Sequence, residues 1–329
     1  MEPLLEVRGL RTHFRTDRGL FKAVDGIDLT VGRGRTVGLV GESGCGKSVT
    51  SLSVMGLVAN PGTVEGEAIR FDGRDLLGLS ADERRRLRGG KMSMIFQEPM
   101  TSLNPVHTIG AQIVEGILAH TRLSPAEARA KAIAMLELVR IPSAAARFDD
   151  FPHRLSGGMR QRVMIAMALS CEPILLIADE PTTALDVTIQ AQILELLQDL
   201  QSRLGMAILI ITHDLGVIAE VADDVVVMYA GKIVESGPVE ALFADPQHPY
   251  TIGLLGSIPR LDVDRERLST IEGTVPGADR QPAGCRFSPR CPFADARCVK
   301  EPPPLRDIGP DHKVACWKAP VELSAELAS

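Results

Sequence analysis

The sequence predicts an α/β protein whose main lobe contains a mainly parallel sheet, with a helical subdomain and a small, irregular, cysteine-rich C-terminal extension. Three observations lead to this prediction. An apolar run at 36–40 leads into a glycine-rich loop and a helix-compatible run. Two more apolar runs, at 174–178 and 206–212, each end in polar residues, as buried parallel strands do at a functional edge. Four cysteines gather in a Pro-rich segment between 285 and 316.

The glycine-rich loop at 41–48 fits the pattern G-x-x-x-x-G-K-[ST] of a phosphate cradle. In such a loop the backbone N–H groups curl around phosphates, Lys47 would reach the β and γ oxygens, and Ser48 would ligate Mg²⁺. The following run, 48–58, suits a helix whose N-terminal dipole would face the phosphates. A chance glycine turn is the alternative, and the flanking strand and helix disfavour it. We expect ATP and Mg²⁺ here, with contacts from Gly41, Ser43, Gly44, Cys45, Gly46, Lys47, Ser48 and Val49.

The second and third apolar runs deliver polar side chains that suit ATP hydrolysis. Asp179 and Glu180 follow the run 174–178 directly. Asp179 would hold Mg²⁺ through water, and Glu180 could polarise the attacking water as a general base. Taken alone, this pair would read equally well as an ordinary acidic turn. His213 follows the run 206–212 and could orient water near the γ-phosphate, whereas an isolated histidine is more often structural or solvated.

Together these residues resemble the nucleotide-binding subunit of an ABC (ATP-binding cassette) system, from about residue 4 to 245. The resemblance implies that Gln97, in Ile-Phe-Gln-Glu-Pro, is the glutamine that contacts Mg²⁺ and the attacking water. It implies a signature motif at 155–159, where Met159 replaces the usual glutamine. Phe14 is the better candidate for stacking on adenine, and Phe21 is the second. The resemblance further assigns γ-phosphate contacts to Ser156, Gly157 and Gly158, and a D-loop to residues 184–186, with Asp186.

The order of motifs predicts two lobes within a nucleotide-binding domain at 1–245. A helix-rich stretch at about 98–158 would form the helical subdomain, because 109–120 and 125–139 carry apolar residues at helical spacing. One cradle and one signature occur, and no internal repeat is visible. In the resembling family these two motifs of one subunit face apart. We therefore expect each ATP to be enclosed between two subunits, the cradle of one chain facing the signature of the other.

Composition narrows the function classes. The chain has 329 residues, 45% hydrophobic and 24% charged, with a net charge of −6. An acidic balance argues against a nucleic-acid surface, and no apolar run reaches the 18 or so residues of a membrane span. The start, Met-Glu-Pro-Leu-Leu-Glu, has no signal-peptide pattern. We expect a cytosolic chain; if it powers transport, other chains must form the channel.

The four clustered cysteines are Cys285, Cys291, Cys298 and Cys316. In a reducing compartment they would not form disulfides. A 4Fe–4S cluster is the preferred interpretation, because irregular Pro-rich backbone can present four thiolates. Structural zinc is the alternative, although the spacing lacks C-x₂₋₄-C pairs, and free thiols are the third possibility. His312 could replace one of the four cysteines as a ligand, and this is the less favoured arrangement. Cys45 and Cys171 are isolated, and we expect both to be plain small residues.

The segment 246–329 resembles the C-terminal extension of ATPase subunits from dipeptide and oligopeptide importers. The similar runs are His-Pro-Tyr-Thr at 248–251 and Gly-Cys-Arg-Phe-Ser-Pro-Arg-Cys at 284–291. The resemblance implies a related second ATPase, two membrane-spanning permease subunits and, indirectly, an extracytoplasmic peptide-binding protein, with this chain on the cytoplasmic face of the membrane. It also implies that some members carry an iron–sulfur cluster at these cysteines. Nickel and glutathione importers share the extension, and a soluble non-transport ABC ATPase is the less favoured class.

Overall fold

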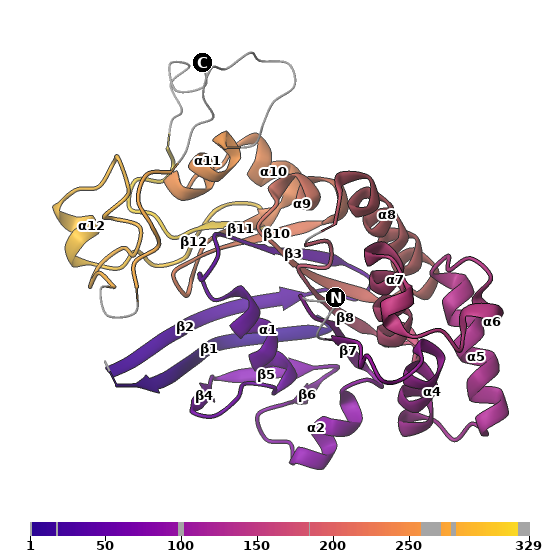
Figure 1. Cartoon of the computed structure of the whole chain (residues 1–329). Helices are drawn as coiled ribbons and strands as arrows, with labels where there is room; N and C mark the ends of the chain where they lie inside the picture. Colours follow the sequence, from indigo (N-terminus) through magenta and orange to yellow (C-terminus); the bar gives the residue numbers. More distant parts are fainter. Residues whose placement is uncertain are drawn as a thin grey trace. The chain divides into compact units, whose positions relative to one another are not determined.

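The computed structural model describes residues 2–17, 19–97, 102–183, 185–257, 271–277 and 281–321. These residues form two compact units, interleaved along the chain. The first contains the described parts of 1–4, 31–36 and 71–211, and the second contains those of 5–30, 37–70 and 212–329. Each unit is described by itself below, with the element labels of Figure 1.

The first unit contains three buried parallel strands. β8 (Leu175–Asp179) pairs in parallel with β7 (Met92–Ile95) on one side and β9 (Ala207–Thr212) on the other. Every residue of the three strands is buried, which matches the continuous apolar runs expected of parallel strands covered on both faces. The predictions of strands at 174–178 and 206–212 are therefore correct to within one residue at each end.

The other regular elements among the described residues of the first unit are helices and the short β6 (Arg74–Asp75). Both predicted amphipathic helices are present, one from 109 to 120 and the other from 125 to 138. A capping box between Ser124 and Glu127 begins the second of them, and Asp186 caps the longest helix through the Ile189 N–H. Helices α4, α5 and α7 pack on one another (Figure 1). The helices of this unit are α2 (Ala81–Leu87), α4 (Ile109–His120), α5 (Pro125–Leu138), α6 (Ala144–Arg147), the 3₁₀ turn η1 (Pro152–Arg154), α7 (Gly157–Leu169) and α8 (Val187–Leu204).

The second unit contains an antiparallel sheet that the sequence analysis did not anticipate. β1 (Leu5–Thr16) lies between β2 (Gly19–Val31) and β5 (Ala68–Phe71), and it also pairs with β4 (Gly62–Glu65). Burial alternates along β1 and β2, as expected when only one face of a strand is covered. The α/β class is as predicted, and this antiparallel sheet adds to the parallel strands of the first unit.

A second group of strands in this unit carries the phosphate-loop candidate. β3 (Thr36–Val40) has the predicted bounds and pairs in parallel with β10 (Asp224–Tyr229). β10 then pairs antiparallel with β11 (Lys232–Pro238), which pairs with a hairpin near the C-terminus. The remaining elements are α1 (Lys47–Met55), α9 (Leu215–Val221), α10 (Val239–Ala244), α11 (Pro249–Gly256), α12 (Ala296–Lys300), β12 (Arg306–Gly309) and β13 (His312–Val314).

One buried carboxylate ties the C-terminal residues to this sheet. Glu235, on β11, is fully buried and accepts hydrogen bonds from the backbone N–H groups of Gln247 (2.7 Å) and His248 (2.9 Å). Its Oε1 also lies 2.8 Å from Nε2 of His312. Burial lowers the pKa of His248 to about 4, so its neutral Nδ1 can accept the Tyr250 N–H at 3.1 Å. The extension is thus part of the core of its unit.

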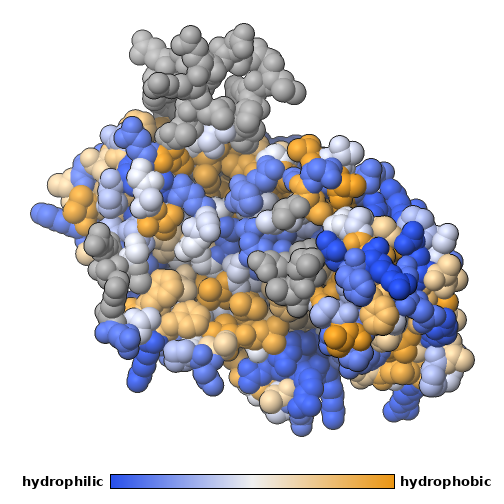
Figure 2. Space-filling model, in the orientation of Figure 1, coloured by the Kyte–Doolittle hydropathy of each residue, from blue (hydrophilic) through white to orange (hydrophobic). Residues whose placement is uncertain are grey.

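Large apolar side chains are exposed at several places on the described surface. On the face seen in Figure 2, hydrophobic residues gather in places among hydrophilic ones. Large exposed apolar side chains come from separate elements, among them Leu20, Val106, Val187 and Val299. Among the described residues, no helix combines the length and apolar character needed to cross a membrane.

Candidate nucleotide and cysteine sites

The loop at 41–48 has the backbone that a phosphate cradle needs. It leaves β3 and enters α1 at Lys47, with positive φ at Gly41, Gly44 and Gly46. A Cβ at Gly41 would lie 2.2 Å from the Met228 carbonyl oxygen, and one at Gly46 would lie 2.4 Å from that of Ala23. These two positions are closed to any side chain, because the loop passes against the backbones of β2 and β10.

Two glycines of the loop provide a matched stability test. Gly41→Ala should lower the free energy of unfolding by at least about 3 kcal/mol, from positive φ plus the clash with Met228. Gly44→Ala should cost only about 1 kcal/mol, because Gly44 has φ +77° but no atom lies within 4 Å of the place that a Cβ would take. Urea denaturation of both variants checks this, and equal losses would contradict the close approach.

Lys47 is held by the loop itself. Its side chain is buried, and Nζ donates to the carbonyl oxygens of Gly41 (2.7 Å) and Glu42 (3.1 Å). Ser48 follows in the first turn of α1 and is half-buried. Cys45 is fully buried and burial raises its pKa, so its thiol is neutral, in keeping with the expectation of a plain small residue. Phe14 and Phe21 stack on each other with centroids 6.2 Å apart, so both adenine candidates lie together on the β1–β2 hairpin.

In the first unit the structure brings together two residues that lie far apart in the sequence. Glu180 follows β8 with φ +47°, and its backbone N–H donates to the Ile211 carbonyl at 2.8 Å. Its Oε2 accepts hydrogen bonds from Nε2 of Gln97 and from Oγ1 of Thr183, both at 2.8 Å. Asp179, the last residue of β8, is buried. The proposed base and the proposed glutamine are thus direct partners, and Thr183 is a partner that sequence reasoning missed.

The signature candidates begin a helix. Ser156 is the N-cap of α7, and its Oγ accepts the Met159 N–H at 3.3 Å. Position 159 therefore serves this cap through its backbone, which methionine supplies as well as glutamine does. Gly158 lies close to α8, since a Cβ there would be 2.8 Å from Ile189 Cγ2. His213 is exposed and directly precedes Asp214, which caps α9. Of the predicted D-loop, Ala184 lies outside the described residues.

The four cysteines of the extension line one small pocket in the second unit. Its volume is about 10 Å³, and Phe287 and Trp317 are among the other residues that line it. The Cys285 N–H donates to the Cys298 carbonyl at 2.7 Å. Burial raises the pKa of Cys285 and Cys316, and raises that of Cys291 to about 11. Among the described residues all cysteines are free, and no group of three or more His, Cys, Asp or Glu is arranged to hold a metal ion.

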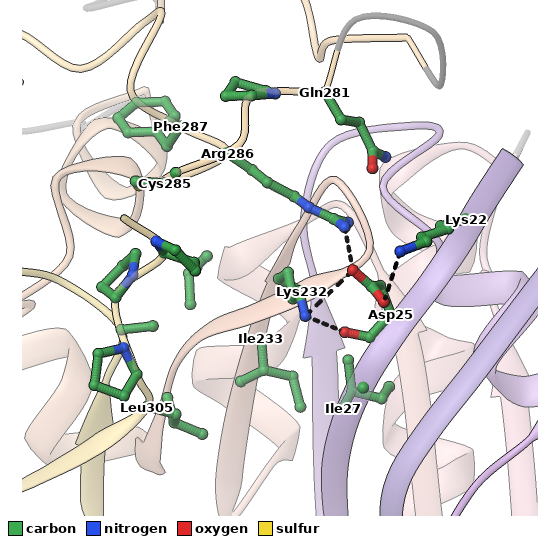
Figure 3. Close-up of a pocket in the computed structure, with 18 of the residues that line it drawn as sticks. Lys22, Asp25, Ile27, Lys232, Ile233, Gln281, Cys285, Arg286, Phe287 and Leu305 are labelled. Carbon is green, nitrogen blue, oxygen red and sulfur yellow. Dashed lines mark hydrogen bonds and ion pairs between the residues drawn. The ribbon is translucent and has the colours of Figure 1, made fainter. Parts of the chain in front are cut away.

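A separate pocket of about 670 Å³ lies where the extension meets β2 and β11 (Figure 3). Asp25 lies at its side, and Arg286, Lys232 and Lys22 all point toward the Asp25 carboxylate. Although burial raises the pKa of Asp25, the charges of Lys232, Arg286 and Lys22 hold it below its usual value. None of the residues 41–48 lines this pocket. The Asp25 carboxylate pairs with both Lys232 and Arg286, so this pocket is where polar contacts join the extension to β2 and β11.

Comparison with known proteins places this architecture. The family model described as ABC transporter matches residues 24–183, and the one described as oligopeptide/dipeptide transporter, C-terminal region, matches 234–298. The chain is 54% identical over 319 residues to a probable peptide ABC transporter ATP-binding protein of Sinorhizobium fredii, covering 96% of this chain and 95% of that protein. It is 52% identical over 313 residues to the dipeptide transport ATP-binding protein DppD of Escherichia coli, covering 95% and 96%.

Solved structures agree with the sequence relatives. The dimeric ATP-binding cassette MJ0796, in a post-hydrolysis state bound to ADP and phosphate, has a TM-score of 0.64 and 25% identity. The match covers 71% of this chain and 98% of that one, so residues remain here that the bare cassette lacks. Both family matches and near-full-length relatives agree on one conclusion. The chain belongs to the ATP-binding proteins of the oligopeptide/dipeptide ABC transporters, and its cassette is an ATPase.

Proposed function

We propose that this chain hydrolyses ATP to power a multi-subunit ABC importer of dipeptides or oligopeptides. The observation that carries the proposal is the match of residues 234–298 to the oligopeptide/dipeptide C-terminal region, on a chain whose relatives match it almost end to end. Two membrane-spanning subunits would form the channel, a related ATPase would complete the nucleotide sites, and a binding protein outside the membrane would deliver peptide. This chain would then sit peripherally on the cytoplasmic face.

Uptake of labelled substrates tests the importer proposal. Cells that lack this chain should lose uptake of a radiolabelled dipeptide or oligopeptide, and the parent sequence should restore it while Lys47→Ala should not. Labelled nickel and labelled glutathione are measured in parallel. Dependence of either of these on the chain, with peptide uptake unaffected, would contradict peptide import and leave the ATPase role intact.

We propose that catalysis is mainly positioning and charge stabilisation. The loop N–H groups and Lys47 bind the phosphates. Water attacks the γ-phosphorus, the bond to the β–γ bridging oxygen breaks, and the water proton passes toward the Glu180 carboxylate. Support for this role is the hydrogen-bonded arrangement at Glu180 Oε2, because Gln97 and Thr183 both donate to that oxygen and orient it. His213 would help to align the water, and the signature motif of the second ATPase would close on the γ-phosphate bound here. Ser156 of this chain would close on the nucleotide of that second ATPase.

The donors assigned to Mg²⁺ suit it by chemistry. Ser48 supplies a hydroxyl oxygen, Gln97 an amide oxygen and Asp179 a carboxylate, and hard oxygen ligands are those that Mg²⁺ prefers. When held by these side chains, Mg²⁺ would neutralise the charge that develops on the phosphates.

The four-cysteine pocket is proposed to hold a 4Fe–4S cluster, with zinc as the alternative. Four thiols on one pocket are the donor set and number that such a cluster takes. Zinc is the alternative because the cysteine spacing lacks the C-x₂₋₄-C pairs of structural zinc sites. A pocket of about 10 Å³ would have to widen around a cluster. His312 pairs with Glu235 and does not line this pocket, which removes the reason to count it as a ligand.

Anaerobic purification checks the metal proposal. The parent protein should be brown and contain about four iron and four sulfide per chain. Cys298→Ser should lose iron, whereas Cys171→Ser should keep it, because Cys171 contacts the Gly116 carbonyl at 3.7 Å and lies in the other unit. A colourless parent with one zinc would support the alternative, and one with neither metal would leave the thiols free.

A further inference from the structure

We propose that the C-terminal extension positions the phosphate loop through Arg290 and Tyr250, which together hold Glu42, and that ATP affinity depends on this contact. We call these three residues the loop latch. The inference rests on the loop at 41–48 binding ATP and goes beyond it, since it gives the extension a role in nucleotide binding. It does not depend on whether the four thiols hold a metal.

The first contact of the loop latch is a bidentate ion pair. Nη1 and Nη2 of Arg290 donate to Oε2 and Oε1 of Glu42 at 2.6 and 3.0 Å. The Arg290 side chain is only 5% exposed and that of Glu42 is 28% exposed. A fork of this kind is stronger and more directional than a single hydrogen bond, and its burial reduces screening by water and salt. The hydrogen bonds to Glu42 raise the pKa of Arg290 further, so its charge is permanent.

The extension orients the guanidinium independently of Glu42. Nε of Arg290 donates to the Glu272 carbonyl at 2.8 Å, and Nη2 also donates to the Ile271 carbonyl at 3.0 Å. Its backbone N–H donates to the Phe287 carbonyl at 2.9 Å. Arg290 is therefore anchored to two segments of the extension while its fork faces the loop. A preorganised donor loses little entropy when it pairs with its acceptor.

The second contact fixes the backbone of the same loop residue. The Glu42 N–H donates to the Tyr250 Oη at 2.8 Å. Tyr250 is fully buried, and its ring packs against Tyr229 and Phe287 with centroids 4.7 and 5.4 Å away. Such a ring cluster immobilises the phenol, so its oxygen is a fixed acceptor. The extension thus holds Glu42 by both its main chain and its carboxylate.

Glu42 in turn determines where Lys47 lies. The Glu42 carbonyl accepts from Lys47 Nζ at 3.1 Å and from the Cys45 N–H at 3.3 Å. A shift of Glu42 would therefore move both the ammonium and the turn that present N–H groups to phosphate. A second effect would also weaken ATP binding. Without Arg290 the Glu42 carboxylate would be unpaired beside a site for a triphosphate, and it would repel that ligand.

Equilibrium binding of ATP to the purified full-length chain tests the loop latch. Arg290→Met keeps much of the apolar side chain and removes the charge, and it should raise the Kd for ATP about tenfold. Arg290→Lys should have a smaller effect, because an ammonium replaces the charge without the fork. Arg297→Met is the matched control. Arg297 is also in the extension, but it pairs with Glu301 and stacks on Trp317, so the Kd of this variant should equal that of the parent.

A second variant and a stability measurement keep the proposal open to refutation. Glu42→Gln should raise the Kd for ATP less than Arg290→Met does, because it leaves no unpaired carboxylate. The double variant, with both changes, should have a Kd close to that of Glu42→Gln alone. Melting temperatures separate a positioning effect from unfolding, and Glu42→Gln serves if Arg290→Met does not fold. Folded variants with the parent Kd would overturn the proposal, as would an equal loss in Arg297→Met. Iron and zinc contents of the same samples separate this result from the cysteine proposal.

Discussion

Lys47→Ala is expected to raise the Kd for ATP about a hundredfold. Lys47 is buried, and its Nζ donates to the carbonyl oxygens of Gly41 and Glu42. These hydrogen bonds offset the desolvation of the ammonium, which lies close to where phosphates would bind. Binding of a triphosphate would give the ammonium anionic partners, and hydrogen bonds between charged groups are worth about 1.5–3 kcal/mol each. Alanine removes these contacts and also the hydrogen bond that Lys47 donates to the Gly41 carbonyl.

Titration of a fluorescent ATP analogue into the purified chain measures this effect. Lys131→Ala is the matched control, since Lys131 forms an ion pair with Glu172 in the other unit and its loss should leave the Kd unchanged. A Lys47→Ala protein that remains folded and binds ATP with the parent Kd would show that the loop is not the phosphate cradle.

Glu180→Gln is expected to slow ATP hydrolysis about a thousandfold while ATP still binds. Glutamine has the size of glutamate but cannot take the proton of the attacking water. Gln97 and Thr183 donate to one carboxylate oxygen of Glu180, and an amide oxygen can still accept both hydrogen bonds. Binding should therefore persist, and the closed dimer should accumulate because its nucleotide is not consumed.

The rate of phosphate release from the assembled transporter measures hydrolysis. Gel filtration with and without ATP measures how much closed dimer accumulates. Glu172→Gln, which neutralises an exposed carboxylate paired with Lys131, should hydrolyse ATP at the parent rate. Hydrolysis by Glu180→Gln at that same rate would show that another group is the base. Slow hydrolysis without an accumulated dimer would instead show that Glu180 is needed for the ATP-bound dimer to close.

Much of the fold could be predicted because the local signals were strong. The run at 36–40 is five apolar or small residues between glycine-rich stretches, and β3 has those bounds. The two helices at 109–120 and 125–138 follow a 3.6-residue apolar period, and the second also has a capping box. The antiparallel sheet of β1, β2, β4 and β5 was missed, because its strands are only half-buried and alternate irregularly with charged residues.

The nucleotide residues were easier to predict than their partners. Lys47 and Glu180 each belong to a short pattern whose chemistry can be inferred from residue type and spacing, whereas Gln97 is implied by the resemblance to the ABC family. Thr183 carries no such pattern, and its contact with Glu180 depends on a turn that follows β8. In the sequence, Tyr250 and Arg290 belong to the runs at 248–251 and 284–291, which indicate a family resemblance but no role for either side chain. Tyr250 and Arg290 lie 208 and 248 positions away from Glu42 along the chain, so only the tertiary fold brings them to it.

By itself, the sequence determined the ATP-binding chemistry, the class of the cassette and the presence of four clustered thiols. These depend on residue type and on short spacings, both of which can be read directly from the sequence. Only the tertiary structure decided that the extension is built onto β10 and β11, that Glu235 is its buried anchor, and that Arg290 and Tyr250 meet Glu42. The physical reason is that an ion pair or a ring cluster depends on distance and burial. Neither follows from sequence spacing when the partners lie on strands and loops far apart in the chain.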